Sequence, residues 1–453
     1  ALLAAEDGGV IILAPGVYSG PGSCNVSVRR SVTLRAENGV DGAVIDCAWE
    51  SRAFSVTDRA HLRIEGVHIK RGFSATNGTL ASAGGCIALD LQSRLTLFES
   101  TLSECKADGY GGAIMLRGAS MLNVTDSVFD SNTAFAGGAI AALDASSVAI
   151  NSSRLVSNKA NFAGGSIVVL PGSTLQMTGS VGEDNTAYGP GSMGGFLAML
   201  GGTGTRMANS KADLCGCALT GNSAHRGGAV ALSGTAELML EDSVLEGNVA
   251  DGQGGAIHLS GSSECVIQGG RLEGNQARRG GALFVSDGSA STVKGTLLTG
   301  NMACATPGSC GSAPCAAADL SGEEGLGGGI GTERSAVVTL EGVQLVGNEA
   351  RGSGGCVHHA GLELRLMGEV VMRECKACNS GGAMEALGLV SVESGGEAVL
   401  ERNSVDNPLS GEGYGGAASL VGSGASLRVS EGALLTVRFN TARSDGGGVH
   451  MTD

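Results

Sequence analysis

The sequence predicts an all-β protein, a right-handed parallel β-helix of roughly 16 coils. Three observations indicate this fold: a Gly-Gly unit that recurs at intervals of 26 or 27 residues over much of the chain, a second unit that ends in asparagine, and short stretches of alternating apolar and polar residues between them. No helical period occurs inside a repeat, and strands this short bury their apolar face only when successive coils stack.

The glycine unit has the form Gly-Gly-x-apolar and occurs thirteen times between Gly84 and Gly446. Its fourth position is a large apolar residue in twelve of the thirteen units, as in Ile87 and Leu283. One such side chain per coil predicts an interior stack. The glycine pair allows a bend where a Cβ would clash or where φ is positive.

The second unit, apolar-x-x-Asn, precedes most of the glycine pairs. Asparagine tolerates the left-handed turn conformation, and identical amides can stack from coil to coil. The predicted rungs of this ladder are Asn132, Asn158, Asn222, Asn248, Asn275 and Asn348. In two units cysteine replaces asparagine, at Cys105 and Cys375.

The stretches between the two units alternate with a period of two, as in Leu122–Val124 and Leu238–Leu240. They predict about three short strands per coil, with turns at pairs such as Asp126-Ser127. Residues 1–83 lack the glycine unit but keep this alternation, so we expect them to form an N-terminal cap, with a short helix at Ala1–Glu6, and the first coils.

We expect residues 1–453 to form a single β-helix domain, in which residues 84–453 are the Gly-Gly repeat coils. The longest interval between glycine units, 47 residues after Gly280, predicts a cysteine-containing loop at about 302–326. No cap follows the Gly446 unit, and an open β-helix end favours aggregation. We therefore expect the C-terminal end to be truncated and the native chain to continue beyond Asp453.

The repeat resembles that of the polymorphic outer membrane proteins (Pmp-type repeats), whose paired signature is Gly-Gly-Ala-Ile and Phe-x-x-Asn. The first motif is literal at Gly111, Gly137 and Gly254, and the second at Phe129 to Asn132, while leucine replaces phenylalanine in most other units. The head, around Ile11–Tyr18, resembles pectin-lyase-like β-helices. The resemblance covers about residues 84–450 and implies a surface-exposed β-helical passenger that acts in adhesion.

The composition of the chain excludes some classes of binding partner. Asp and Glu number 44 against 29 Lys and Arg, for a net charge of −15, and such a surface repels phosphate backbones. No apolar run approaches the ~18 residues of a spanning helix, so we expect no membrane insertion in this segment. The predicted partners are therefore other protein chains of a surface assembly, or extracellular glycans, and not nucleic acid.

The chain contains 13 cysteines, a number typical of an oxidising compartment. Cys86 to Cys105 and Cys356 to Cys375 both span 19 residues between equivalent repeat positions, which predicts the same disulfide twice. Sequence alone does not fix the connectivity of the other candidates, Cys24 with Cys47 and the loop residues Cys304, Cys310 and Cys315. Candidate N-glycosylation sites also favour an extracellular or cell-surface protein, and they are Asn25, Asn77, Asn123 and Asn151.

Catalytic candidates are few. Asp126 and Asp242 occupy equivalent turns about four coils apart, or roughly 19 Å, whereas a carboxylate pair needs ~5–9.5 Å. We therefore interpret both as turn formers. His358 and His359 are adjacent on a predicted strand, point to opposite faces and make a poor shared metal site. We expect no cofactor, no metal and no catalytic residues.

These features predict a non-catalytic, structural or adhesive extracellular β-helix, not an enzyme. It would be part of a larger secreted or cell-surface protein, and a component of an extracellular filament or appendage is one variant of this function. The alternative is a polysaccharide-active enzyme or a carbohydrate-binding module on a pectin-lyase-like scaffold. A close trio of acidic residues on one strand face would favour that alternative, and the sequence shows none.

Overall fold

The computed structural model describes residues 5–20, 22–39, 42–75, 83–202, 209–308, 310, 324–406 and 413–452. Every regular element in these ranges is a β-strand, and none of their segments is a helix that could cross a membrane. The chain divides into two compact units. Unit 1 comprises Ala1–Ala224 and Thr235–Glu237, and unit 2 comprises His225–Gly234 and Leu238–Asp453.

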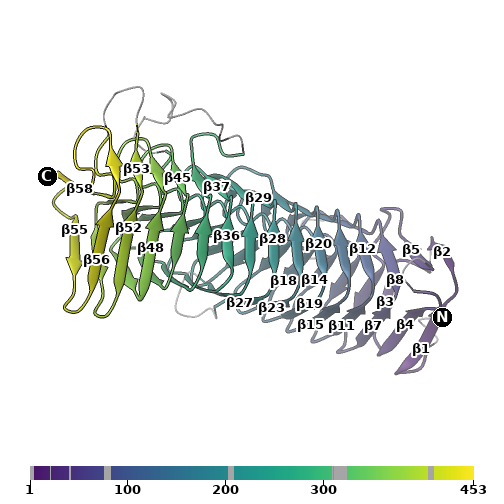
Figure 1. Cartoon of the computed structure of the whole chain (residues 1–453). Helices are drawn as coiled ribbons and strands as arrows, with labels where there is room; N and C mark the ends of the chain where they lie inside the picture. The colour runs from purple at the N-terminus through teal and green to yellow at the C-terminus, as the bar shows by residue number, and fades with distance from the viewer. Residues whose placement is uncertain are drawn as a thin grey trace. The chain divides into compact units, whose positions relative to one another are not determined.

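Most turns of the chain contribute one strand to each of four parallel sheets. One turn of unit 1 consists of β11 (Arg94–Phe98), β12 (Thr101–Ser103), β13 (Lys106–Ala107) and β14 (Ile114–Leu116). Equivalent strands of successive turns pair in parallel, as β11 does with β15 (Met121–Thr125), and Figure 1 shows them stacked side by side within each unit. Three of the four sheets have 15 strands in the described part of the chain, so the predicted right-handed parallel β-helix is confirmed, with about fifteen turns.

The fourth sheet differs from the prediction of about three strands per coil. Its strands follow the asparagine position and are as short as two residues, as in β13. An alternation of apolar and polar residues cannot be recognised over two residues, which is why the sequence pattern did not reveal them.

The N-terminal region forms strands of the same helix. The predicted strand and turn at Val10–Tyr18 are β1 (Gly9–Leu13) and β2 (Gly16–Ser19), and β1 pairs in parallel with β4 (Val32–Ala36). Residues 1–4 of the predicted capping helix lie outside the described residues, and Ala5 and Glu6 are not helical.

The core is an interior stack of apolar side chains, one column per sheet. The fourth residue of each glycine unit is buried, from Ile87 in β10 (Ile87–Leu89) to Ala418 in β54 (Ala418–Val421). Val449, in the last described turn, is the exception at 40% exposure. Direct strand pairing of Ile87 with Ile114, and of Ile114 with Ile140, stacks this column.

The two glycines of each unit are required for different reasons. Gly254 has a φ of +69°, which L side chains rarely adopt. A Cβ on Gly255 would lie against the carbonyl oxygen of Gly281 in the next turn, 2.6 Å from the backbone nitrogen of Gln276. The bend therefore needs a left-handed residue followed by one without a side chain.

The asparagines form a buried ladder in each unit. In unit 2 the Asn275 amide donates to Leu245 O and to Asn301 Oδ1, both at 2.9 Å, and its own oxygen accepts from Asn248. All six predicted rungs have no exposed surface, and Asn185, Asn301 and Asn403 are further buried rungs.

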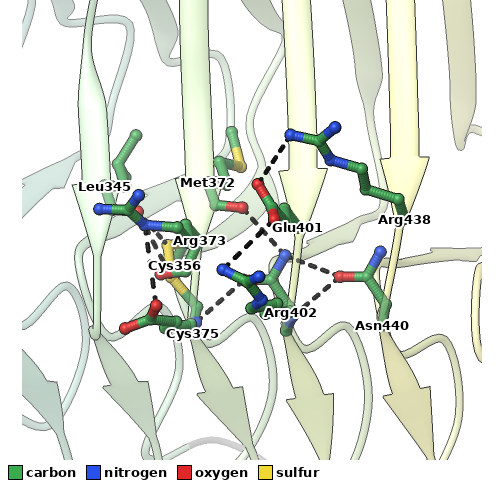
Figure 2. A network of polar contacts seen from close by, with 11 residues as sticks. Leu345, Cys356, Met372, Arg373, Cys375, Glu401, Arg402, Arg438 and Asn440 are labelled. Carbon is green, nitrogen blue, oxygen red and sulfur yellow. Dashed lines mark hydrogen bonds and ion pairs between the residues drawn. A yellow bond between two sulfur atoms is a disulfide. The ribbon is translucent and has the colours of Figure 1, made fainter.

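Cysteine occupies the ladder position at two places. Cys105 donates its backbone N–H to Asn132, and Cys375 donates to Asn403. Figure 2 shows the second place, where Cys375 lies beside Cys356 and the ladder ends at Asn440. At these places the disulfide replaces the amide of a rung, and the backbone N–H of the cysteine still donates to the next asparagine.

Candidate functional site

A corner of the fold in unit 2 carries polar and charged side chains at equivalent positions of successive turns. The residue immediately before each Gly-Gly forms one side of this corner, which we call the wall column. Backbone hydrogen bonds join it from turn to turn, because the first glycine of one turn donates to the wall residue of the next. Its members are Arg226, Gln253, Arg279, Leu326, Ser353, Ser380 and Tyr414.

The other side of the corner is formed by the second residue of each strand that follows a Gly-Gly pair. We call this series of residues the floor column. These side chains point away from the interior, on the opposite face from the fourth-position stack. Direct strand pairing places its members in order: His258, Phe284, Gly331, His358, Glu385, Ser419 and His450. The strands that carry the first five are β34 (Ile257–Leu259), β38 (Leu283–Val285), β42 (Ile330–Glu333), β46 (Val357–Ala360) and β50 (Met384–Ala386).

The equivalent corner in unit 1 is apolar. Its floor residues include Met115 and Val168, which pack with the wall residues Ala136 and Ala163 in one buried cluster. Two aromatic side chains beside this wall, Phe135 and Phe162, stack with ring centroids 5.6 Å apart. The same backbone positions therefore carry different chemistry in the two units.

An open cleft of about 240 Å³ lies at the wall of unit 2. Arginines and one histidine from neighbouring turns dominate its lining, which comprises His225, Arg226, Gly252, Gln253, Arg278, Arg279 and Glu324. We call it the arginine cleft. β29 (Ser223–Arg226) and β33 (Val249–Gln253) end in it, and Arg278 and Arg279 follow β37 (Gln276–Ala277).

Two of the three arginines are held by carboxylates. Arg278 Nη1 lies 2.6 Å from Glu324 Oε1, and Arg279 Nη1 lies 3.4 Å from Glu333 Oε2. Arg226 is exposed and forms no ion pair with any residue that the structure describes. A guanidinium has five N–H donors, and an ion pair with one carboxylate does not engage all of them.

A buried histidine lies behind the cleft. His258 is 1% exposed, stacks on Phe284 with ring centroids 5.9 Å apart, and its Nε2 lies 3.2 Å from Gln253 Oε1. Burial, with repulsion from Arg226, lowers the pKa of His258 to about 3. The imidazole is therefore neutral, and its Nδ1 is a buried acceptor without a partner in the described structure.

His358 and His359 point to opposite faces of β46, as the sequence indicates. His358 Nδ1 lies 2.9 Å from Glu385 Oε2 in the corner, whereas His359 is buried in the interior with its Nδ1 2.8 Å from Thr332 Oγ1. Within the described residues, no group of three or more His, Cys, Asp and Glu side chains could hold a metal ion.

The structure joins the cysteines of the two equivalent repeats in pairs, Cys86 with Cys105 and Cys356 with Cys375. Two further disulfides link Cys24 to Cys47 and Cys304 to Cys310. Cys378 is also disulfide-bonded, and Cys315 lies outside the described residues. This disulfide content suggests an extracellular protein.

The other predicted residues lie apart from the corner. Asn25, Asn123 and Asn151 are exposed, and Asn77 lies outside the described residues. Asp126 and Asp242 have φ of 49° and 45°, as expected of turn formers. Glycosylation at the exposed asparagines stays a prediction.

The comparisons with known proteins concern the fold. No protein-family model matches the chain, so nothing supports the Pmp-type resemblance beyond the parallel β-helix itself, and no curated protein matches it either. The solved structures that are similar to it include three polysaccharide-active enzymes. The catalytic unit of a GH87 α-1,3-glucanase from Streptomyces thermodiastaticus is 14% identical with a TM-score of 0.41, and the alignment covers 98% of this chain and 66% of the glucanase.

The second structure is the A-module of a mannuronan C-5 epimerase from Azotobacter vinelandii, 14% identical with a TM-score of 0.39, covering 95% of this chain and 91% of the module. The third is a PL6-family alginate lyase, 9% identical with a TM-score of 0.19, covering 100% and 98% of the two chains. At such values the likeness is one of fold, and the ligand of this chain has to be inferred from its own surface.

The comparisons contradict the structural or adhesive function predicted from the sequence. The three solved structures above are polysaccharide-active enzymes, so they agree with the alternative function and not with a non-catalytic structural or adhesive protein. That expectation depended on the search for clustered carboxylates, and the arginine cleft is a site of the opposite charge. A signal was present in the sequence, because Arg226 and Arg279 occupy the same position before Gly-Gly.

Proposed function

We propose that this chain is an extracellular protein that binds an acidic polysaccharide along the arginine cleft. The observation that carries this proposal is the convergence of Arg226, Arg278 and Arg279 on one open cleft, in a chain whose net charge is −15. A cluster of cations on such an acidic protein is a local departure from its overall charge, and it favours an anionic ligand.

The chemistry of the cleft suits carboxylated sugars. Guanidinium groups bind carboxylates through paired N–H donors, and these charge-assisted bonds are stronger than bonds between neutral groups. Arg226 forms no ion pair with a described residue and is exposed, so it is available to a ligand. Gln253 supplies a neutral polar amide that can bind sugar hydroxyls.

The repeat of the fold favours a polymer. Successive turns place equivalent wall residues about 4.8 Å apart, so a ligand with its own regular repeat meets equivalent groups in successive turns. Arg226, Gln253 and Arg279 are one such series. Because the cleft is open, a polysaccharide longer than the cleft can extend beyond it in both directions.

Nucleic acid is a poorer fit to the same cleft. Glu324 and Glu333 lie beside the arginines and would repel a dense row of phosphates. A uronic-acid polymer carries one carboxylate per sugar and has hydroxyl groups between them, which matches a cleft of mixed charged and neutral groups.

The proposal is tested by isothermal titration calorimetry with the intact chain, using polygalacturonate fragments as the acidic probe and dextran of similar length as the neutral one. We expect binding of the acidic probe only, and weaker binding as salt is raised. Replacing Arg226 and Arg278 together by glutamine should weaken it by roughly 100-fold, because each lost charge-assisted bond is worth about 10-fold.

The matched control is the pair Arg154→Gln and Arg438→Gln. Both arginines are exposed and ion-paired, with Glu183 and Glu401 respectively, but neither lies in the cleft. Equal binding of dextran, or an equal loss of affinity in the control variant, would contradict the proposed function.

A further inference from the structure

The corner of unit 2 holds a buried carboxylate that is fully engaged by its neighbours. Glu385 is 8% exposed, its Oε2 lies 2.9 Å from His358 Nδ1, and its Oε1 accepts a hydrogen bond from Ser380 Oγ. Ser380 Oγ lies 3.1 Å from Ser353 Oγ. Two wall residues and one floor residue therefore hold this carboxylate in place.

The hydrogen bonds decide the charge of Glu385. Burial alone would raise its pKa, but the bonds from His358, Ser380 and Ser353 outweigh burial and lower the pKa below its usual value. An ionised carboxylate accepts hydrogen bonds and donates none, so it fixes the proton of the imidazole on Nδ1.

The second ring nitrogen of His358 is left free. With Nδ1 protonated and directed to Glu385, Nε2 of the neutral ring is a proton acceptor. This nitrogen has no hydrogen-bond partner in the described residues, and the His358 side chain is 13% exposed. A carboxylate that orients a histidine whose other nitrogen is open to solvent is the arrangement of a general base.

The position of His358 connects it to the arginine cleft. Arg279 Nη1 lies 3.4 Å from Glu333 Oε2 at the end of β42, and β42 pairs directly with β46, so this ion pair lies at the end of the strand next to that of His358. The residue opposite His358 on β42 is Gly331, which has no side chain of its own and against which the Phe284 ring lies. Adjacent strands lie about 4.8 Å apart, so a chain held by Arg279 can reach Nε2.

We infer that His358 is the catalytic base, and Glu385 its positioning residue, of an elimination reaction on the acidic polysaccharide. This inference rests on the proposed function, since Arg279 must hold a sugar carboxylate. His358 Nε2 takes the proton from the carbon next to that carboxylate, and the electron pair of the C–H bond becomes a carbon–carbon double bond. The neighbouring C–O bond to the next sugar breaks, and the imidazolium returns the proton to the leaving oxygen.

Elimination fits the corner better than hydrolysis does. Glycoside hydrolysis generally uses two carboxyl groups, one of which protonates the leaving oxygen. In the described part of this corner Glu324 and Glu333 are paired with arginines, and Glu385 is enclosed by His358 and Ser380. Elimination needs one group that accepts and returns a proton, with cations that neutralise the carboxylate, and both are present.

The test incubates the intact chain with polygalacturonate and follows new reducing ends together with ultraviolet absorbance of an unsaturated sugar. We expect both signals to rise together in the wild type. His358→Gln should reduce the rate by at least about 100-fold while calorimetric binding of the polymer is unchanged. Glu385→Gln should lower kcat with little change in KM and shift the acidic limb of the pH–rate profile, which a purely structural role would not do.

His61→Gln is the control, because His61 is a partly buried histidine bonded to Thr96 in unit 1 and should leave the rate unchanged. Three results would each overturn the inference and leave the proposed function standing. They are polymer binding by the wild type without new reducing ends, new reducing ends without an unsaturated sugar, and full activity of His358→Gln. Failure of every acidic polymer to bind would instead overturn both.

Discussion

His258 shows that equivalent positions of the corner can carry side chains of different chemistry on the same backbone. The equivalent floor positions of unit 1 include Met115 and Val168, which need no hydrogen-bond partner. His258 occupies the same place in a strand of the same length, stacks on Phe284 and contacts Gln253 of the cleft. Its neutral form is favoured because a buried charge would lose its hydration.

The buried state of His258 predicts acid sensitivity of the fold. Its pKa is about 3 in the folded chain and about 6.5 when unfolded, so below pH 6.5 the unfolded chain binds a proton that the folded chain does not. The free energy of unfolding should therefore decrease as the pH falls from 6.5 towards 3, by on the order of 2 kcal/mol between pH 7 and pH 5. Urea unfolding at these two pH values measures it.

The variant His258→Phe keeps a ring on Phe284 and removes the titrating group. We expect its free energy of unfolding to fall less between pH 7 and pH 5 than that of the wild type. An identical decrease in both proteins would show that other groups cause the acid sensitivity.

At the scale of the strand and turn, the repeat is held by polar groups that are satisfied only between turns. Asn275 serves the turn before it and the turn after it, through Leu245 O and Asn301 Oδ1. The contribution of each rung to the free energy of unfolding therefore depends on the rungs on both sides of it. An end rung has fewer partners and more contact with water.

Replacing Asn275 by alanine should cost about 2–4 kcal/mol, because it leaves several buried polar groups of the adjacent turns without partners. Asn440→Ala is the matched control: this side chain is only partly buried, accepts from Asn403 and donates to Leu400 O, but has no following rung among the described residues. Its cost should be about 1 kcal/mol. Chemical denaturation of both variants gives the two values, and equal costs would show that the ladder adds nothing beyond each local bond.

How far the sequence predicts these elements depends on how often they repeat. The columns of Ile87 and Asn132 recur in turn after turn, so both the interior stack and the ladder are visible as periodic positions. The strands after the asparagine, such as β13, have two residues and carry no period of their own. Their existence follows from the stacking of turns, which only the folded chain displays.

The corner could not be predicted because it depends on two positions that vary. Wall residues range from Arg279 to Ser380, and floor residues from Gly331 to Glu385, so neither column has a common residue type. Contact between Ser380 and Glu385 spans five residues across the glycine bend and arises from the angle of that bend. The arginines before Gly-Gly can be recognised in the sequence. Only the folded chain shows that they line one cleft.

For the whole molecule, the two units show one backbone repeat used for two kinds of surface. Unit 1 carries an apolar corner, and unit 2 carries arginines, histidines and a buried carboxylate at the same repeat positions. Disulfides occur in both units, with Cys86–Cys105 in the first and Cys356–Cys375 in the second. A shared scaffold that is covalently fixed leaves the corner positions free to vary.

The pattern of bonded and free cysteines gives a prediction for the molecule as purified. Among the described cysteines, three are thiols outside any disulfide: Cys215 is exposed, and Cys217 and Cys265 are buried. Burial raises the pKa of both buried thiols, that of Cys265 to about 12, and the thiolate is the reactive form. Iodoacetamide should therefore label Cys215 alone in the native chain, and Cys217 and Cys265 in addition after denaturation without reductant.

Peptide mapping by mass spectrometry distinguishes these sites, and labelling after reduction provides the control, since it should reach the bonded cysteines as well. Cys86 and Cys356 are the decisive positions because their disulfides occupy equivalent places in the repeat. Label on either of them without reductant would mean that the isolated chain is not oxidised. That result would also remove the disulfide support for an extracellular setting, in which an acidic polysaccharide would be met.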